Sequence, residues 1–404
     1  MNLRDLFPGY YRPTEAEFRK MWEEGIVSVD ANILLHVYRY SPALRQTLFD
    51  LMEKVGNRLW IPNRVAFEFS RNRLKVISGQ EKAYDDACAV LEKVTGIIKS
   101  ELPPRHPVID IDEIKGTFLT LISQKQEALK RLKAKHPQVP DDDPALAKLS
   151  SLLGGKIGSG DAPDREQKYP DEGEKRYKAK IPPGFRDASK DDDPLQRYGD
   201  YIVWRQLLDQ VQAVKAPFFI FATDDSSDDW WWKQDGKTIG PHPSLIHEAK
   251  REANSRAYLY RGDQFIRYGT QHFGLKADEK LFDEAATVRR EIRSRASANR
   301  FVRRFQVTQA LVSLGQIEDQ VLLNDLTSRI WRAQRNPGKR ESLDARLKQC
   351  NLPSAEAILE LATQVPIRVH GSLKHREEAR SPDLPTAPPP DRSPPAESAS
   401  QGGS

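Results

Sequence analysis

The chain has 404 residues, of which 38% are hydrophobic and 30% are charged. This length gives room for two domains or for one enlarged domain, and the low hydrophobic share indicates polar insertions and a disordered tail outside the core. The net charge of +5 is the small difference between 63 basic and 58 acidic residues, so a nucleic-acid partner is permitted by composition but not required by it.

Cysteine use and hydropathy exclude several classes of protein. Only Cys88 and Cys350 are present, without a Cys-x-x-Cys spacing, which argues against a disulfide framework or a zinc site. The first 25 residues lack the apolar segment of a signal peptide, and no stretch of about 18 apolar residues predicts a membrane span. We therefore expect a cytoplasmic protein that does not enter the membrane.

Strand and helix signals alternate through the first 275 residues. The apolar, β-branched run 26–34 is typical of a buried parallel strand that ends at Asp30. Strands are predicted at 26–30, 58–62, 217–223 and 257–260, and helices from 14, from 41 to about 56, from 63 to about 99, from about 109 to 135, from 199, from 243, and at 263–273. This alternation predicts an α/β fold, a three-layer sandwich around a parallel sheet.

Composition shifts mark the remaining organisation. Residues 137–198 are rich in Asp, Gly, Pro and Lys and are interpreted as a long inserted loop, within an insertion of about 103–198. Residues from 277 to 365 are highly charged and predict helices. After Pro366 the composition turns to Pro, Ser, Ala and Gly, which predicts disorder at 381–404. The expected domains are 1–275, 276–365 (helical) and 366–404 (a disordered tail).

Carboxylates recur where predicted elements meet one edge of the sheet. They are Asp30, Glu68, Asp200, Asp224 and Asp225. The carboxyl ends of parallel strands are where α/β sheets bind ligands, and carboxylates held close together repel one another. A hard cation such as Mg²⁺ or Mn²⁺ removes that repulsion, and oxygen ligands suit it. The alternative interpretation of each acid is non-functional: it caps a helix or is a solvated side chain. Asn32 and Thr223 stand next to these acids and could orient them or a water.

Four segments together resemble the signature segments of PIN-domain nucleases, closest to the large bacterial PIN-like subgroup. They are Val-Asp-Ala-Asn-Ile-Leu-Leu at 29–35, Pro-Asn-Arg-Val-Ala-Phe-Glu-Phe at 62–69, Gly-Asp-Tyr-Ile-Val-Trp at 199–204 and Phe-Ala-Thr-Asp-Asp at 221–225. Segments 154–158, 172–177 and 180–187 are also similar to that subgroup. The resemblance implies a Rossmann-like α/β/α fold and cleavage of RNA or DNA that depends on Mg²⁺ or Mn²⁺.

The resemblance also implies which acids hold the metal. Asp30, Glu68 and Asp200 match the first three acids of the family pattern. The fourth stays open, because the Thr-x-Asp pattern points to Asp225 while Asp224 is adjacent and Asp228 is near. The bound metal would activate a water for attack on the phosphodiester.

Three further features have two interpretations each. Lys175, Arg176, Lys178 and Lys180 would line a phosphate-binding groove or belong to a solvated loop. The aromatic run 230–232 would stack bases or, more often for such a run, form core. The arginine-rich stretch 289–304 would bind nucleic acid or a protein partner, or be a solvated helix face.

These observations predict a metal-dependent nuclease, an endo- or exonuclease of RNA or DNA, with a regulatory protein partner and, by analogy, a role in antiviral defence or stress response. The alternative is a non-catalytic nucleic-acid-binding or scaffolding protein that uses the same fold. A phosphatase-like hydrolase with an aspartyl nucleophile is disfavoured, because it needs Asp-x-Asp after the first strand and position 32 is Asn.

Overall fold

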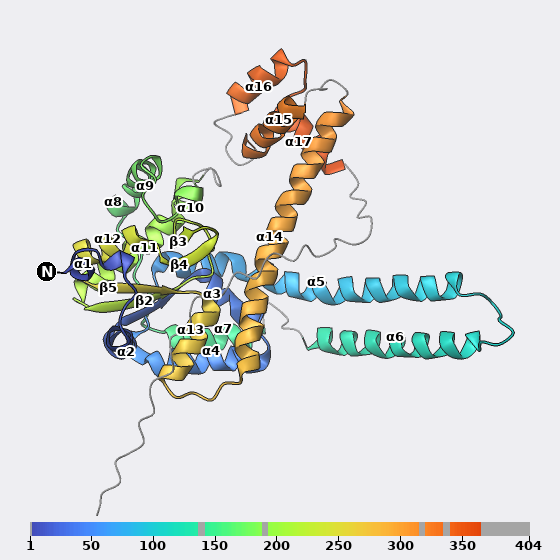
Figure 1. Ribbon diagram of the computed structural model, residues 1–404, viewed down its shortest axis with the longest axis horizontal. Coiled ribbons are helices and arrows are strands. Elements are labelled where there is room, and N and C mark those ends of the chain that lie inside the picture. The colour runs from blue at the N-terminus through green and yellow to red at the C-terminus, as the bar shows by residue number, and fades with distance from the viewer. Residues whose placement is uncertain (1, 136–141, 188–192, 315–319, 334–339, 365–404) are drawn as a thin grey trace, which may run out of the picture.

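The computed structural model describes residues 2–135, 142–187, 193–314, 320–333 and 340–364. Its centre is a parallel sheet in the order β1 (Ile26–Val29), β2 (Phe218–Ala222), β5 (Arg256–Tyr260) (Figure 1). Val29 pairs with Ala222, and Ala222 pairs with Tyr260, so all three strands end at the same edge. The predicted α/β fold with a parallel central sheet is confirmed.

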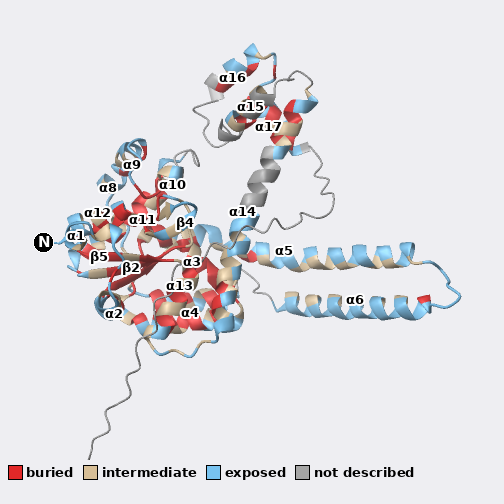
Figure 2. Ribbon diagram, in the orientation of Figure 1, coloured by how far each residue is buried: buried red, intermediate tan, exposed pale blue. Residues whose placement is uncertain are grey.

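Helices cover both faces of this sheet, which is why its strands are apolar on both sides. The contacts place α11 and α12 on one face and α2, α4 and α13 on the other (Figure 1). The helices up to residue 272 are α1 (Leu3–Leu6), α2 (Glu15–Glu24), α3 (Ala31–Leu35), α4 (Pro42–Val55), α5 (Asn63–Glu101), α6 (Ile111–Ala134), α7 (Pro144–Leu153), α8 (Pro163–Glu166), α9 (Tyr169–Lys178), α10 (Pro194–Arg197), α11 (Gly199–Ala213), α12 (Pro243–Ala253) and α13 (Gly262–His272). Figure 2 shows the buried residues concentrated in and around the sheet.

The predicted strand at 58–62 is reduced to isolated bridges. Leu59 pairs with Val27 of β1, and Ile61 pairs with Ile157 of the insertion, both in parallel. A 3₁₀ turn at Gly56–Arg58 precedes this segment and α5 begins at Asn63. Only the four residues 59–62 therefore lie between these two elements, and the ladder cannot grow on either side.

The prediction of a long loop at 137–198 is wrong for much of that stretch. α7 lies in it, with Leu149 and Leu153 buried in the main core, and Asp143 caps its start by accepting a hydrogen bond from the Leu146 amide at 2.8 Å. The short helices α8, α9 and α10 follow. The helical spacing of the leucines at 146–153 specifies α7, but it is flanked by loop-like composition. Residues 136–141 and 188–192 of the predicted loop lie outside the described residues.

Two features of the middle region position the site. α5 and α6 pack side by side and extend away from the sheet as a hairpin (Figure 1). A second hairpin, β3 (Trp231–Gln234) with β4 (Lys237–Pro241), follows the acidic turn after β2. Its turn residues Asp235 and Gly236 both have positive φ, 49° and 76°, which is the geometry that Asp-Gly favours. That dipeptide was the sequence signal for this unpredicted hairpin.

The C-terminal region is helical, as predicted. It consists of α14 (Glu279–Ser313), α15 (Gln320–Ala333), α16 (Arg340–Gln349) and α17 (Ala355–Gln364). α14 starts against the main core through Phe282 and ends in a separate hydrophobic cluster that includes Leu326 and Ile358. The predicted tail, 366–404, lies outside the described residues. In the described part of the chain, no helix is long and apolar enough to span a membrane.

Candidate metal centre

Asp30 lies at the carboxyl end of β1, where the strand stops and α3 begins. One carboxylate oxygen, Oδ1, accepts a hydrogen bond from the Ala31 amide at 2.6 Å. The other, Oδ2, accepts from Asn32 Nδ2 at 2.5 Å and from Thr223 Oγ1 at 2.7 Å. The two neighbours that the sequence singled out as supporting residues thus hold this carboxylate in place.

The electrostatics around Asp30 indicate which acids face it. Burial, followed by the charge of Glu68 and more weakly by that of Asp225, raises the pKa of Asp30 to about 7, against opposing hydrogen bonds from Thr223 and the Ala31 amide. Burial is the largest of these causes, and the neighbouring carboxylates add to it. Glu68 comes from α5 and Asp225 from the turn after β2, so acids from two other elements act on Asp30 through their charges.

Asn32 and Thr223 tie the ends of β1 and β2 together. Asn32 donates through Nδ2 to Thr223 Oγ1 at 3.1 Å and accepts at Oδ1 from the Asp224 amide at 3.0 Å. The Asp225 amide in turn donates to Thr223 Oγ1 at 3.1 Å. Thr223 is fully buried, so this network orients the acidic turn from inside the protein.

The two adjacent aspartates after β2 have different environments. Asp224 Oδ2 lies 2.6 Å from His36 Nε2, and its Oδ1 accepts from the Gly262 amide at 2.8 Å. Although burial raises it, the hydrogen bond and charge of His36 hold the pKa of Asp224 below its ordinary value. Both oxygens of Asp224 are thus engaged by the protein. Asp225 is the aspartate whose charge acts on Asp30.

Glu68 lies in the second turn of α5. Its Oε1 accepts from Arg64 Nε at 2.7 Å, one helical turn earlier, and Arg64 also donates to Gln196 Oε1 at 3.0 Å. A Cβ added at Gly199 would lie 2.8 Å from Glu68 Oε1. Glu68 therefore lies against the first turn of α11, because a glycine there leaves space for it.

Asp200 is the second residue of α11 and accepts a hydrogen bond from Trp230 Nε1 at 3.2 Å. The insertion passes directly over it, since a Cβ added at Gly184 would lie 2.8 Å from the Asp200 Cβ. Gly184 has φ of 89°, a conformation that favours glycine. The segment 180–187, which resembles the PIN-like subgroup, thus lies at the candidate site.

Asp228, expected as a supporting residue, lies apart from these acids. Its carboxylate binds Lys233 Nζ at 2.5 Å and Arg186 Nη2 at 3.3 Å, and its side chain is half exposed. The hydrogen bond from Lys233 lowers the pKa of Asp228. Its role in the structure is to join the β3 strand to the insertion.

The donor set fits a hard divalent cation by its chemistry. Asp30, Glu68 and Asp225 are oxygen donors whose mutual repulsion a cation would relieve. Across the described residues, however, no three Asp, Glu, His or Cys side chains stand close enough as found to hold a metal ion. Glu68 is engaged within the protein by its ion pair with Arg64.

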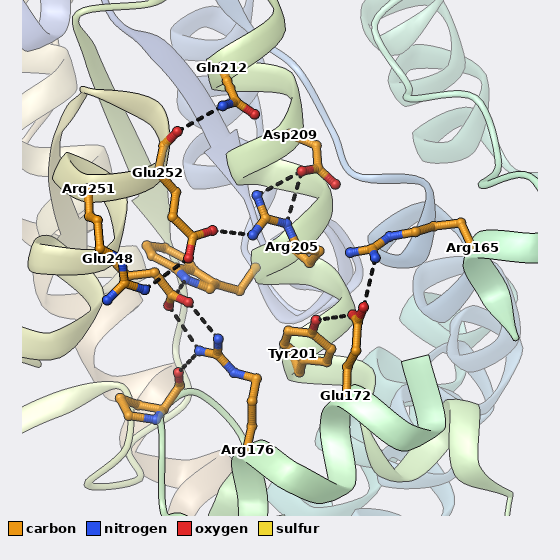
Figure 3. A network of polar contacts seen from close by, with 12 residues as sticks. Arg165, Glu172, Arg176, Tyr201, Arg205, Asp209, Gln212, Glu248, Arg251 and Glu252 are labelled. Atoms are coloured by element: carbon orange, nitrogen blue, oxygen red, sulfur yellow. Dashed lines mark hydrogen bonds and ion pairs between the residues drawn. The ribbon is translucent and has the colours of Figure 1, made fainter. Parts of the chain in front are cut away.

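The basic residues of the insertion are not equivalent. Arg176, expected to contact phosphate, instead makes a two-pronged ion pair with Glu248 of α12, at 2.5 and 2.9 Å (Figure 3). Its guanidinium also stacks 4.9 Å from the Tyr201 ring. This contact ties α9 to the core and leaves Arg176 without access to a phosphate. Lys175, Lys178 and Lys180 are all exposed, and Lys178 pairs with Glu174 at 2.8 Å.

The tryptophans after β2 are core residues. Trp230 and Trp231 are 1% and 2% exposed, and Trp230 stacks on Phe221 of β2 at 5.4 Å between ring centroids. The core interpretation is therefore confirmed for these two, and stacking on bases is excluded. Trp232 is half-buried and meets Tyr10 edge-on at 5.5 Å.

Basic residues that the sequence analysis did not single out lie beside the acids. Arg39 approaches His36 Nδ1 at 3.4 Å, and Arg261 lies 5.3 Å over the Trp231 ring. Burial and then the charge of Arg289 lower the pKa of Arg261, so α14 lies next to it. Arg289 itself binds Asp263 at 3.0 Å. The sequence did offer a signal for His36, because it follows Asp30 by only six residues, less than two turns of helix.

The family comparison matches the part of the chain that forms this site. A family model described as a PIN-like domain covers residues 26–245, more than half of the chain and a range that includes Asp30, Glu68, Asp200, Asp224 and Asp225. No curated protein and no solved structure matches the chain.

Proposed function

The chain belongs to the family of PIN-like domains, and from this premise we propose that it is a metal-dependent nuclease that hydrolyses phosphodiester bonds of RNA or DNA. A PIN-like domain has a nuclease-type fold. The observation that carries the proposal is the pKa of Asp30, raised to about 7 by burial and by the charges of Glu68 and Asp225. Such crowding costs stability unless a cation relieves it.

In this proposal Asp30, Glu68 and Asp225 hold Mg²⁺ or Mn²⁺, with Asp200 completing the set. The bound ion would supply an activated water and stabilise charge on the phosphate. Asn32 and Thr223 hold the Asp30 carboxylate in place through their hydrogen bonds. Arg64 holds Glu68 until the cation takes that place. Asp224, engaged by His36, is a structural neighbour and not a ligand.

Positive charge beside the acids supports a nucleic-acid substrate. Arg39 and Arg261 lie next to the acidic turn, and the charge of Arg293 on α14 acts on Arg261. Lys175 and Lys180 of the insertion are exposed. We propose that these side chains contact backbone phosphates, which are recognised mainly through charge. The side chains of Arg300, Arg303 and Arg304 lie outside the described residues.

The domain division and biological setting are proposals as well. We assign the nuclease to residues 1–275, a helical region to 276–365 and a tail to 366–404, supported by the two separate hydrophobic clusters, of which the first also takes in the start of α14. Both cysteines are free thiols, which supports a cytoplasmic setting. A regulatory protein partner and a role in antiviral defence rest on analogy alone.

Cleavage assays test the proposal directly. Labelled single-stranded RNA, single-stranded DNA and duplexes are incubated with the protein in Mg²⁺, Mn²⁺ or EDTA. We expect cleavage of at least one substrate with metal, none in EDTA, and none by Asp30→Asn. Equal activity of the pure Asp30→Asn protein would contradict the assigned site.

Metal binding distinguishes the proposed nuclease from the alternative, a non-catalytic nucleic-acid-binding protein. A catalytic centre gains thermal stability in millimolar Mn²⁺ by ligand linkage, and Asp30→Asn loses that gain. A docking module binds nucleic acid with no response to Mn²⁺. Binding without cleavage and without a metal-induced rise in melting temperature would favour the docking module.

A further inference from the structure

The α5–α6 hairpin uses only part of its apolar surface. α6 meets α5 through one row of side chains at heptad spacing, of which Ile111 and Ile122 are buried. The other members of this inner row are at least half-buried. They are Lys115, Leu119, Gln126, Leu129 and Lys133. This inner row accounts for the packing of the hairpin on itself.

A second row on α6 has the same spacing and no partner among the described residues. It consists of Ile114, Phe118, Leu121, Lys125, Ala128 and Leu132. Phe118, Leu121 and Leu132 are 51%, 47% and 54% exposed. Steps of four and three residues over almost the whole helix are the pattern of a coiled-coil seam. We call these six residues the outer row of α6.

α5 carries a matching outer row. Its members are Ala83, Val90, Val94 and Ile97, and Val90 and Ile97 are 57% and 58% exposed. Each outer residue of α6 directly precedes an inner residue, and each outer residue of α5 directly precedes a residue that is at least half-buried. A step of one residue rotates the side chain by about 100°, and the two helices are antiparallel, so both rotations turn the outer rows to the same side of the hairpin. The hairpin therefore has one broad apolar face made by two helices.

We propose that this face docks on the hairpin of a second copy of this chain, with the two hairpins antiparallel, to form a four-helix bundle. An exposed apolar face of this length is unusual for a monomer. Two helical hairpins that pack through their apolar faces form a four-helix bundle, which buries both faces in one core. The inference does not depend on the proposed nuclease function.

The spacing of the outer rows fits a two-fold axis. With the axis level with residue 123, Phe118 of one α6 lies opposite Ala128 of the other, a large side chain against a small one. Ile114 then lies opposite Leu132, and Leu121 lies opposite the aliphatic stem of Lys125, whose ammonium reaches solvent. An isologous contact of this kind needs self-complementary rows, and the outer row of α6 has that symmetry.

The outer row of α5 shares the same axis. Lys133 of α6 binds Asp85 at 2.7 Å and lies 3.9 Å from Glu81. Lys133 of α6 is thus level with 81–85 of α5. Because the two helices are antiparallel, position 123, ten residues before Lys133, is level with 91–95, ten residues after 81–85. The midpoint between Val90 and Val94 is position 92, which lies within that range, so Val90 of one copy meets Val94 of the other. The outer rows of α5 and α6 therefore place the two-fold axis at the same level along the hairpin.

Charge favours a second copy in the antiparallel orientation. Asp110 and Lys135 continue the line of the outer row at the two ends of α6, and Glu113 and Arg131 lie beside that row, on the side away from α5. A two-fold axis perpendicular to the helices keeps this flank on one side, so the acidic start of each α6 lies along the basic end of the other. A parallel arrangement would place like charges together, which is destabilising.

Light scattering during size-exclusion chromatography of the full chain tests the proposal. We expect a mass of twice the chain mass of 46.0 kDa. Phe118→Glu with Leu121→Glu should give the monomer mass at the same concentration. The matched control is Thr120→Glu with Ser123→Glu, which adds the same charge on the opposite side of α6 and should stay dimeric. Far-ultraviolet circular dichroism checks that each variant folds.

Charge reversal tests the partner and its orientation without touching the apolar row. Glu113→Lys alone and Arg131→Glu alone should each weaken self-association by about tenfold or more, since each puts like charges opposite one another. An equal mixture of the two variants should restore dimers. A wild-type monomer at tens of micromolar, a dimeric Phe118→Glu/Leu121→Glu protein, or a mixture no better than its components would overturn the proposal.

Discussion

The His36 imidazole lies 2.6 Å from the Asp224 carboxylate and thereby separates the roles of two adjacent aspartates. Asp224 faces inward to His36 and the Gly262 amide. Asp225, one residue later, acts on Asp30 across the strand ends. His36 and the Gly262 amide engage both oxygens of Asp224, and we therefore propose Asp225 as the metal ligand.

Asparagine at each of these positions should therefore have opposite effects. Asp225→Asn should lower cleavage by ~100-fold or more and leave the melting temperature unchanged, because an asparagine Oδ1 can still accept from the Ser227 amide. Asp224→Asn should cost about 1–3 kcal/mol of stability, since it weakens a buried bond to His36. Thermal melts and cleavage rates of both variants check this. A stable but inactive Asp224→Asn protein would reverse the assignment.

The raised pKa of Asp30 predicts how stability depends on pH in EDTA. Because its pKa rises from an ordinary 3.8 to about 7 on folding, the protonated carboxyl favours the folded state. That contribution is complete below pH 3.8 and is lost as pH rises through 7, by up to ~4 kcal/mol. Asp30→Asn cannot titrate there. The melting temperature of the wild type relative to the variant should fall from pH 5 to pH 8, and parallel pH profiles would contradict the raised pKa.

Substitutions at Arg176 and at its neighbouring lysines should have different effects: the first should lower stability and the second should weaken nucleic-acid binding. Arg176→Ala leaves the buried Glu248 carboxylate without its ion-pair partner and should cost about 3 kcal/mol or more. Lys175→Ala with Lys180→Ala should leave the melting temperature unchanged. If these lysines contact phosphates, the salt slope of log affinity should become shallower by about 0.7 to 0.9 per contact. Denaturant unfolding and binding titrations at several salt concentrations measure both. A lysine variant that loses stability but keeps its slope would contradict the assignment.

The exposed arginines of α14 nearest the site should contribute to substrate binding. Arg293 acts on Arg261 and Arg295 acts on Arg39 through their charges. Changing both to alanine should weaken nucleic-acid affinity and flatten its salt dependence. Lys276→Ala with Lys280→Ala is the control, because Lys280 lies about 20 Å farther back along the same helix. Equal losses for the two pairs would indicate a general charge effect and not a contact surface.

Much of the site could be predicted from local sequence. Asp30 follows an apolar run and Asp225 follows another, and parallel strands bring such ends to one edge. The strands at 217–223 and 257–260 and the helices after 41 and 63 were predictable because their apolar spacing is strong. α7 was not, since its four leucines are surrounded by Asp, Gly and Pro.

Only the tertiary structure distinguished between neighbours of the same chemical type. The Thr-x-Asp pattern points to Asp225 but leaves Asp224 open, and only the fold shows that His36, from another element, engages Asp224. Arg176 and Lys175 both look available for phosphate, but a buried glutamate on α12 engages only Arg176. Sequence spacing places a side chain on a face of its own strand or helix. Which partner that face meets depends on packing between distant segments, and that packing determined the role of each charge.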